Sequence, residues 1–168
     1  MSSASDYLED KLLDHTLNFG NGSLTVGTGR GFAAPATVYV ALFADSGSGV
    51  AATLESNTSG TDASNKFGYY EITNASGGYE RQSITFANAG ASTTGTISSN
   101  ATVSFPVATG DYDTAGSTGN VVTHLALMDS NTIGSGNVLF FGALTTNKTV
   151  SSGDQFTISS GNLSISLA

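Results

Sequence analysis

The chain has 168 residues, only 11% of them charged, and a formal net charge of -8. This length suffices for one domain with a substantial core. An acidic chain with only five Lys and Arg residues lacks the clustered cations that nucleic-acid phosphates require. We therefore predict a single β domain over residues 1–168 and no nucleic-acid partner.

The composition also limits what can stabilise the chain. It has no cysteine, so disulfides and thiolate metal sites are excluded. No stretch approaches the roughly eighteen consecutive apolar residues of a membrane span, and the N-terminus has no basic start followed by an apolar run. We expect a soluble protein without membrane contact, stabilised by packing and by partner subunits.

Residues 1–19 are predicted to form a helical N-terminal segment. The helix is expected from Ser5 to Leu17, because Asp6 can cap it and Glu9 follows at the capping-box spacing. Leucines at i,i+4 spacing make an apolar stripe. A helix of about three turns is marginal alone in water, so the stripe must dock either on the chain's own sheet or on a neighbouring subunit. The expected assembly contacts are Tyr7, Leu8, Leu12, Leu13 and Leu17.

Two segments are predicted to be surface loops or insertions. Residues 20–34 are glycine-rich, and the glycines around Arg30 match neither common phosphate-binding pattern. Residues 45–66 consist mostly of Gly, Ser, Thr, Asn and Asp, with little to bury.

Three apolar runs are predicted to form the centre of a sheet. Thr37–Ala44 is one, and Val122–Asp129 and Val138–Leu144 form a hairpin around a turn-rich SNTIGSGN. Apolar side chains alternate onto both faces of each run. This pattern is typical of strands that are covered on both sides.

Further short strands complete the prediction. Phe67–Thr73 and Glu80–Phe86 flank a glycine turn and are interpreted as a second hairpin. The other expected strands are Thr96–Phe105, Gln155–Ile158 and Leu163–Leu167. Together these patterns predict an all-β, antiparallel β-sandwich or barrel of about eight strands, with one short N-terminal amphipathic helix.

The sequence carries no catalytic motif. His15 and His124 are the only histidines, and G-x-S-x-G is absent, so we predict no enzymatic activity and no cofactor. Asp111 and Asp113 form a D-x-D that could offer oxygen ligands to calcium, but the rest of an EF-hand is missing. We predict no metal site by default, and the sequence leaves open whether residues 45–66 and 111–120 bind a ligand or calcium.

Aromatic side chains offer one alternative function. Tyr69, Tyr70 and Tyr79 could stack on sugar rings and form a glycan-facing surface. Tyrosine is also a common strand residue that stabilises sheets through cross-strand pairs. Both interpretations fit the sequence.

An ordered series of motifs resembles a known family. The series is YLEDKLLDHTL, PATVYVALFAD, GGYERQSITF, VSFPVATG, VTHLALMDS, NVLFFGALTTNKTVSSGDQFTIS and NLSISL. It is similar to the small tail-fibre-like or decoration-type structural proteins of tailed bacteriophages. The resemblance covers most of the chain, and Gly20–Phe32 and Asp45–Asn65 look like insertions relative to it.

The resemblance implies a non-enzymatic virion subunit on the outer surface of the phage particle. Its expected partners are other copies of itself and other virion proteins, either the major capsid or tail proteins. Two roles remain open, a capsid decoration subunit or a tail-fibre or collar subunit. The alternative from a different class is a glycan- or host-receptor-binding module of a phage tail.

Overall fold

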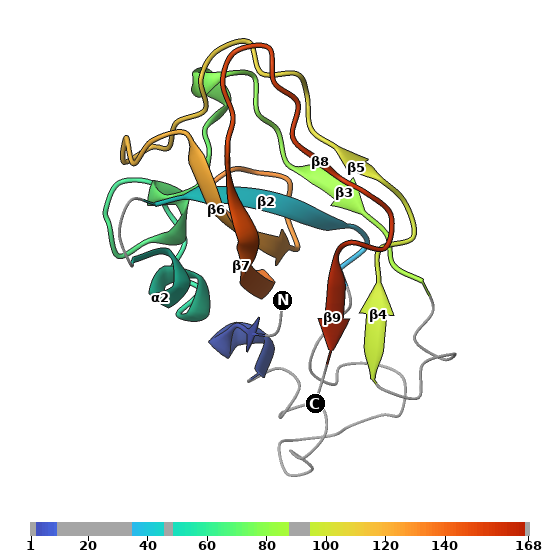
Figure 1. The fold of residues 1–168 in the computed structure, drawn as a ribbon. Coiled ribbons are helices and arrows are strands. Elements are labelled where there is room, and N and C mark those ends of the chain that lie inside the picture. Colours follow the sequence, from blue (N-terminus) through green and yellow to red (C-terminus); the bar gives the residue numbers. More distant parts are fainter. Residues whose placement is uncertain (1–2, 10–34, 46–48, 88–94, 167–168) are drawn as a thin grey trace.

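The computed structural model describes residues 3–9, 35–45, 49–87 and 95–166. Within these ranges the chain is mostly β, and every strand pair is antiparallel, as predicted (Figure 1). The strands are β1 (Ser3–Ala4), β2 (Val38–Ala44), β3 (Gln82–Ile84), β4 (Thr96–Ser98), β5 (Val103–Ser104), β6 (Val121–Met128), β7 (Val138–Thr149), β8 (Thr157–Ile158) and β9 (Ser164–Ser166). Besides the helical residues 6–9, the helical elements are α2 (Gly49–Glu55) and two 3-10 turns, η1 (Phe67–Tyr69) and η2 (Asn74–Ser76).

The largest sheet has five strands in the order β1-β7-β6-β2-β3. The predicted central hairpin is confirmed, because β6 pairs with β7 and the register places Leu125 opposite Gly142. The predicted strand before residue 45 is also confirmed as β2, which lies against the other edge of β6.

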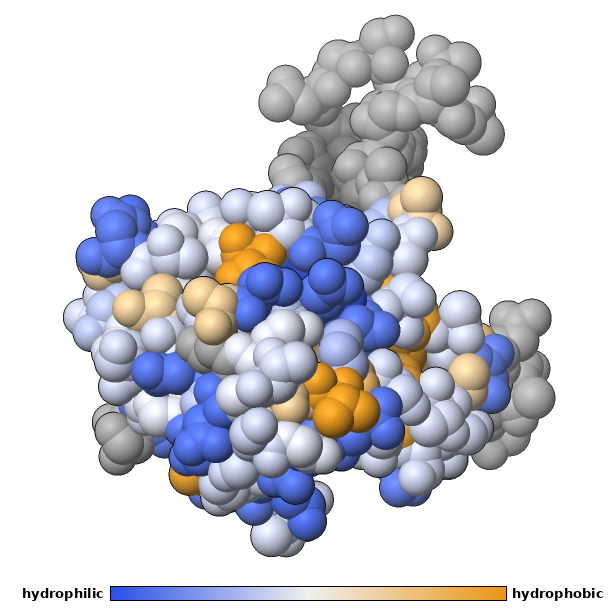
Figure 2. Space-filling model, turned by 90° about the horizontal axis from the view of Figure 1, so that it is seen from above, coloured by the Kyte–Doolittle hydropathy of each residue, from blue (hydrophilic) through white to orange (hydrophobic). Residues whose placement is uncertain are grey.

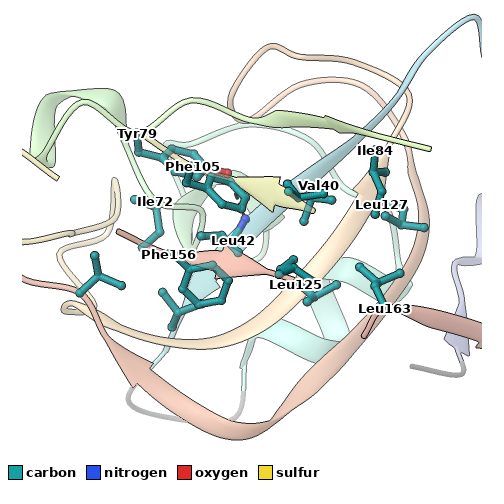
Figure 3. Close-up of a cluster of buried hydrophobic side chains, with 14 of the residues drawn as sticks. Val40, Leu42, Ile72, Tyr79, Ile84, Phe105, Leu125, Leu127, Phe156 and Leu163 are labelled. Atoms are coloured by element: carbon teal, nitrogen blue, oxygen red, sulfur yellow. Dashed lines mark hydrogen bonds between the residues drawn. The ribbon is translucent and has the colours of Figure 1, made fainter. Parts of the chain in front are cut away.

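Both faces of this sheet are covered, as the alternating apolar pattern predicts. On β2, Val40 and Leu42 enter one core cluster, whereas Ala41 and Phe43 enter another on the opposite face. The first cluster is the larger one (Figure 3). It also includes residues of β5, β8 and β9. The second lies beneath α2 and η1.

Two small sheets, β4-β9 and β5-β8, face the first cluster. β3 contacts β5, and a bridge between Phe86 and Ser99 links the chain after β3 to the chain after β4. The strands therefore wrap around the core from β7 through β6, β2 and β3 to β8 and β9. Among the described strands, no strand pairs with β7 on one side and with β8 or β9 on the other. The arrangement of strands around the core is therefore open between β7 and the β8–β9 segment.

The prediction that residues 45–66 form a loop is wrong for α2. Asp45 caps this helix, because its Oδ2 accepts hydrogen bonds from the backbone N–H groups of Gly49 (2.9 Å) and Val50 (3.3 Å). Val50 and Leu54 are buried at i,i+4 spacing against the sheet. Tertiary packing thus gives a short helix to a segment whose composition predicts a loop.

The predicted hairpin of Phe67–Thr73 with Glu80–Phe86 is also wrong. Phe67 begins η1, and the next residues form isolated bridges to distant partners, Glu71 with Phe43 and Ile72 with Thr114. β3 pairs with β2 instead of with residues 67–73. The predicted strand Thr96–Phe105 is interrupted in its middle, and its two halves, β4 and β5, belong to different sheets.

The N-terminal helix can be compared with the structure only at its start. Residues 6–9 are helical, while the rest of the predicted Ser5–Leu17 helix and the glycine-rich residues 20–34 lie outside the described residues. The helix is capped by Ser5 and not by Asp6, because Ser5 Oγ accepts the Leu8 backbone N–H at 3.3 Å. No helix in the described part of the chain is long and apolar enough to cross a membrane.

Candidate assembly site

The N-terminal segment is attached to the edge of the main sheet. β1 pairs with β7, placing Ser3 opposite Phe141 and Ala4 opposite Phe140. Ser5 is fully buried, and its hydroxyl donates to the Val138 carbonyl. Its backbone N–H donates to the Leu139 carbonyl at 3.3 Å. Residues 3–5 are therefore hydrogen-bonded to the outer edge of β7 and belong to the sheet.

The predicted assembly residues can now be placed in part. Leu8 is buried in the chain's own core, and Tyr7 packs against that core while remaining partly exposed. Leu8 is thus covered by its own subunit, as the first of the two docking alternatives expects. The remaining stripe residues, Leu12, Leu13 and Leu17, lie outside the described residues.

An apolar pocket of about 260 Å³ opens beside this segment. It is lined by Leu8, Pro35, Val38, Phe86, Ile97, Leu127, Leu139, Phe140 and Ile165. These residues come from the N-terminal segment, β2, β4, β6, β7, β9 and the chain after β3. Val38, Phe86, Ile97 and Phe140 are only partly buried. Among the described residues, the core reaches the surface at this pocket without a polar cover.

Elsewhere the described surface is polar. Figure 2 shows a face that is mostly hydrophilic, with small separate hydrophobic spots. Among the described residues, the exposed large hydrophobic side chains are Val107 and Val121, at 53% and 38% exposure. Single exposed apolar residues are ordinary. A continuous apolar cavity is more informative, because it can receive a side chain from another protein.

A second notable feature is a buried ionic cluster. We use this name for Glu71, Tyr79 and Arg81 with the backbone groups that they contact. The Arg81–Glu71 pair is bidentate, with Nε–Oε1 at 2.6 Å and Nη2–Oε2 at 2.7 Å, and both side chains are fully buried. Glu71 Oε2 also accepts the Gly134 backbone N–H at 2.8 Å. A buried pair of this kind requires that its remaining donors and acceptors be satisfied.

Backbone carbonyls and a tyrosine supply those partners. Arg81 Nη1 donates to the carbonyls of Ser130 (2.7 Å) and Ser135 (3.0 Å) in the β6–β7 turn. Tyr79 OH donates to Glu71 Oε1 at 3.4 Å and accepts the Leu42 backbone N–H at 3.0 Å. The cluster thereby joins the segment after η1, the start of β3 and the β6–β7 turn.

The electrostatics of the cluster follow from burial. Burial acts to lower the pKa of Arg81, but the hydrogen bonds and charge of Glu71 outweigh it and raise the pKa above its ordinary value. Burial, together with the Glu71 charge, raises the pKa of Tyr79 well above its ordinary value. The Arg81 guanidinium and the Tyr79 phenol therefore both keep their protons near neutral pH.

The structure does not assemble the three predicted glycan-facing tyrosines into a surface. Tyr79 is a correction, because it is 0% exposed and stacks on Phe105 in the core. Tyr70 is buried, and its hydroxyl donates to the Ser64 carbonyl at 3.2 Å. Tyr69 remains partly exposed and packs edge-on against Tyr70. Two of the three rings thus contribute to packing.

The D-x-D carboxylates are engaged by backbone groups. Asp111 accepts the Ser152 N–H at 3.1 Å, and Asp113 accepts those of Thr114 (2.8 Å) and Gly119 (3.1 Å). Within the described residues, no group of three or more His, Cys, Asp or Glu side chains could hold a metal ion.

Sequence reasoning missed both the pocket and the ionic cluster. Glu71 is a charged residue inside the mostly apolar run FGYYEIT, and Arg81 lies in the strand-like run ERQSITF. A charge in such a run is a signal of a buried pair, although their partners in the β6–β7 turn could not be identified from spacing. The pocket is formed by segments distant in sequence and has no local signature.

No curated protein matches the chain. A family model described as Podophage GP4 fiber I protein gp80 matches residues 3–166, nearly the whole sequence. This match confirms the expectation of a tail-fibre-type structural protein on the exterior of the virion. The chain belongs to the family of the Podophage GP4 fiber I protein gp80.

Proposed function

We propose that this protein is a non-enzymatic accessory fibre subunit that joins other virion proteins through the apolar pocket and the N-terminal segment beside it. The carrying observation is the pocket, because it is a continuous apolar cavity on a chain whose described surface is mostly polar. An apolar side chain of a neighbouring virion protein would fill it, and the apolar surface that this contact removes from water would stabilise the complex.

The position of the pocket supports this role. Leu8 forms part of its wall, so the N-terminal segment and the pocket make one continuous surface. The predicted stripe of Leu12, Leu13 and Leu17 follows directly in the sequence and would extend that contact. Attachment through one apolar region would leave the polar remainder of the molecule facing solvent.

A fibre or collar position on the tail is favoured over head decoration, because the matching family is described as a fibre protein. Glycan binding through Tyr69, Tyr70 and Tyr79 has little support, since two of these rings are buried. We therefore do not propose a glycan-binding site on this protein.

The first test changes the pocket. Phe86→Asp places a charge in the apolar wall, where burial on assembly would be costly, and we expect incorporation into particles to fall at least about tenfold. Val107→Asp is the matched control, because it makes the same polar change at an exposed apolar residue that does not line the pocket. Quantitative immunoblotting of purified particles gives the measurement, and thermal unfolding checks that both variants fold. Normal incorporation of folded Phe86→Asp would contradict the pocket's role.

The second test changes the stripe. Replacing Leu12 and Leu13 together by Asp is expected to abolish assembly onto the particle. Incorporation of this double variant at normal copy number would remove the stripe from the proposal.

The position of the subunit on the particle is tested by immunogold labelling of intact particles. Gold on the tail supports a fibre or collar subunit, and gold over the head contradicts it.

A further inference from the structure

The apolar pocket lies where a long part of the chain leaves the described structure and returns to it. Residues 10–34 follow Glu9 and lead into Pro35. Leu8 and Pro35, which flank this segment at its two ends, are both wall residues of the pocket. The segment therefore departs from the rim of the pocket and comes back to the same rim.

The start of the N-terminal helix fixes the direction in which later side chains point. Residues 6–9 are helical, and the Glu9 N–H donates to the Ser5 carbonyl at 3.0 Å. Leu8 is 4% exposed and lines the pocket, so the face of the helix that carries Leu8 is the inner one. Successive residues of a helix are rotated by about 100°. The orientation of Leu8 thus sets the rotation of the whole predicted Ser5–Leu17 helix.

The predicted stripe then divides into two faces. Continued from Leu8, the helix places Leu12 about 40° away, on the same side. It places Leu13 about 140° and Leu17 about 180° away, on the opposite side. A helical side chain also leans toward the N-terminus and covers the surface beside the preceding turn. For Leu12 the preceding turn is that of Leu8, so Leu12 is the stripe residue that a continued helix directs at the pocket.

The chemistry of the pocket suits this occupant. A cavity of about 260 Å³ lined by apolar residues can receive a leucine side chain. Left open, it would expose its apolar wall to water, which is unfavourable. A side chain tethered one helical turn from Leu8 has an effective concentration on the order of millimolar. The chain's own Leu12 therefore competes strongly with any untethered protein for the pocket.

Two other segments outside the described residues border the pocket less favourably. Residues 88–94 lie between two wall residues, but they are Asn, Ala, Gly, Ser and Thr and offer no large apolar side chain. Residues 167–168 follow the wall residue Ile165 and include Leu167, but they adjoin the wall at one end only. The N-terminal segment combines large apolar side chains with a wall residue at both of its ends.

We propose that Leu12 occupies the apolar pocket of its own subunit while the protein is free, and that Leu13 and Leu17 point away from it. The contact regulates the attachment site and in this respect rests on the proposed function, because a side chain of a neighbouring virion protein must displace Leu12 to enter. The free subunit thereby exposes less apolar surface to unspecific association. Leu13 and Leu17 are the stripe residues that remain available to the partner.

The test measures how fast single thiols on the purified free protein react with a maleimide. The chain has no cysteine, so each variant carries one thiol. We expect Leu12→Cys to react at least about tenfold more slowly than Leu13→Cys, because a thiol held in the pocket reacts only when the contact opens. Leu13→Cys is the matched control on the opposite face, and in denaturant the two rates should become equal. Equal rates in the folded protein overturn the proposal.

A second change shows whether the protection comes from this pocket. Phe86→Asp, added to Leu12→Cys, places a charge in the wall and should bring the labelling rate to within about threefold of that of Leu13→Cys. Val107→Asp does not change the wall and should leave the labelling slow. Ile97→Thr is the wall variant to use if thermal unfolding shows that Phe86→Asp does not fold. Protection that no wall variant removes overturns the proposal, because Leu12 would then be covered elsewhere.

Other occupants of the pocket would give different results, each of which overturns the proposal. Slow labelling of Leu12→Cys that appears only as protein concentration rises would assign the contact to a second copy. Fast labelling of Leu12→Cys, together with slow labelling of Leu167→Cys that Phe86→Asp accelerates, would assign the pocket to residues 167–168. Attachment is measured separately, as incorporation into particles. An unprotected Leu12 would leave the proposed function intact, and failed incorporation would leave the protection of Leu12 unchanged.

Discussion

The ionic cluster and the apolar pocket are opposite solutions to burial in one small chain. In the cluster, the side chains of Glu71 and Arg81 are buried and hydrogen-bonded to each other. Backbone groups of the β6–β7 turn supply further hydrogen-bond partners to both side chains. In the pocket, apolar side chains from many strands meet around a cavity and carry no polar groups into it. The cluster is complete within one subunit, whereas the pocket has room for a side chain that the described residues do not supply.

This difference indicates where stability and where assembly reside. A bidentate buried pair with satisfied neighbours fixes one arrangement of the loops around it. A cavity lined by apolar groups lacks packing contacts on one side, so filling it from outside is favourable. We therefore expect changes in the cluster to affect the folding of the free protein and changes in the pocket wall to affect assembly.

The largest expected effect comes from breaking the ion pair. Glu71→Gln leaves the Arg81 guanidinium buried without its counter-charge, which should lower the free energy of unfolding by about 3–5 kcal/mol. Chemical denaturation of the purified protein measures it. The reverse change, Arg81→Met, should cost a similar amount, because it leaves the Glu71 carboxylate buried without its counter-charge.

The matched control for the buried ion pair is an ion pair on the surface of the protein. Lys66 and Asp62 form a pair at 2.7 Å with i,i+4 spacing on the surface, and such pairs contribute little. Asp62→Asn should leave the denaturation midpoint unchanged. If the two pairs proved equally dispensable, the cluster would not be the element that fixes the loops.

An effect of intermediate size on the free energy of unfolding is expected from two buried tyrosines, of which only Tyr79 has hydrogen-bond partners for its hydroxyl. The Tyr79 hydroxyl accepts the buried Leu42 N–H and donates to Glu71, so Tyr79→Phe should cost about 1–3 kcal/mol. Tyr112 packs edge-on against Tyr79, but its buried hydroxyl has no hydrogen-bond partner among the described residues. Tyr112→Phe should therefore be neutral or stabilising.

Both tyrosine variants remove one oxygen from adjacent rings, so thermal or chemical unfolding of the two compares hydrogen bonding at nearly constant packing. A loss of stability in Tyr112→Phe as large as that in Tyr79→Phe would show that ring environment, and not hydrogen bonding, decides the outcome.

The strands of the main sheet could be predicted because their information is local. In β2 and β6, apolar residues occupy both alternating positions, and this pattern identifies strands covered on both sides without any knowledge of the partner. Turn-forming residues around Gly134 and Gly136 then separate β6 from β7, and the hairpin follows.

The missed elements depend on contacts that spacing does not reveal. The segment around Val50 and Leu54 becomes a helix because Asp45 caps it and Phe43 lies beneath it. Phe67 has an apolar, strand-like sequence context, yet η1 forms there beside α2. In the site, the Glu71 and Arg81 charges were visible in the sequence, but the carbonyls of Ser130 and Ser135 that complete their cluster come from a turn about fifty residues away.

The smallest expected effect concerns His124, a polar side chain of β6 outside both regions. It is partly buried, its Nδ1 lies 2.9 Å from Thr123 Oγ1, and burial lowers its pKa below the ordinary value although the Asp45 charge opposes this. The unfolded chain therefore binds a proton at higher pH than the folded chain does. The contribution of His124 to stability is complete above its unfolded pKa of about 6.5 and is lost as pH falls through the lower folded value.

Unfolding measured between about pH 5 and pH 8 should show this decline in the wild type. His124→Gln should reduce the slope in that window, whereas an unchanged slope would assign the decline to other titrating groups. The comparison extends the contrast between regions to a third kind of burial, because the Asp45 charge only partly offsets the effect of burial on His124, whereas Glu71 outweighs that effect on Arg81.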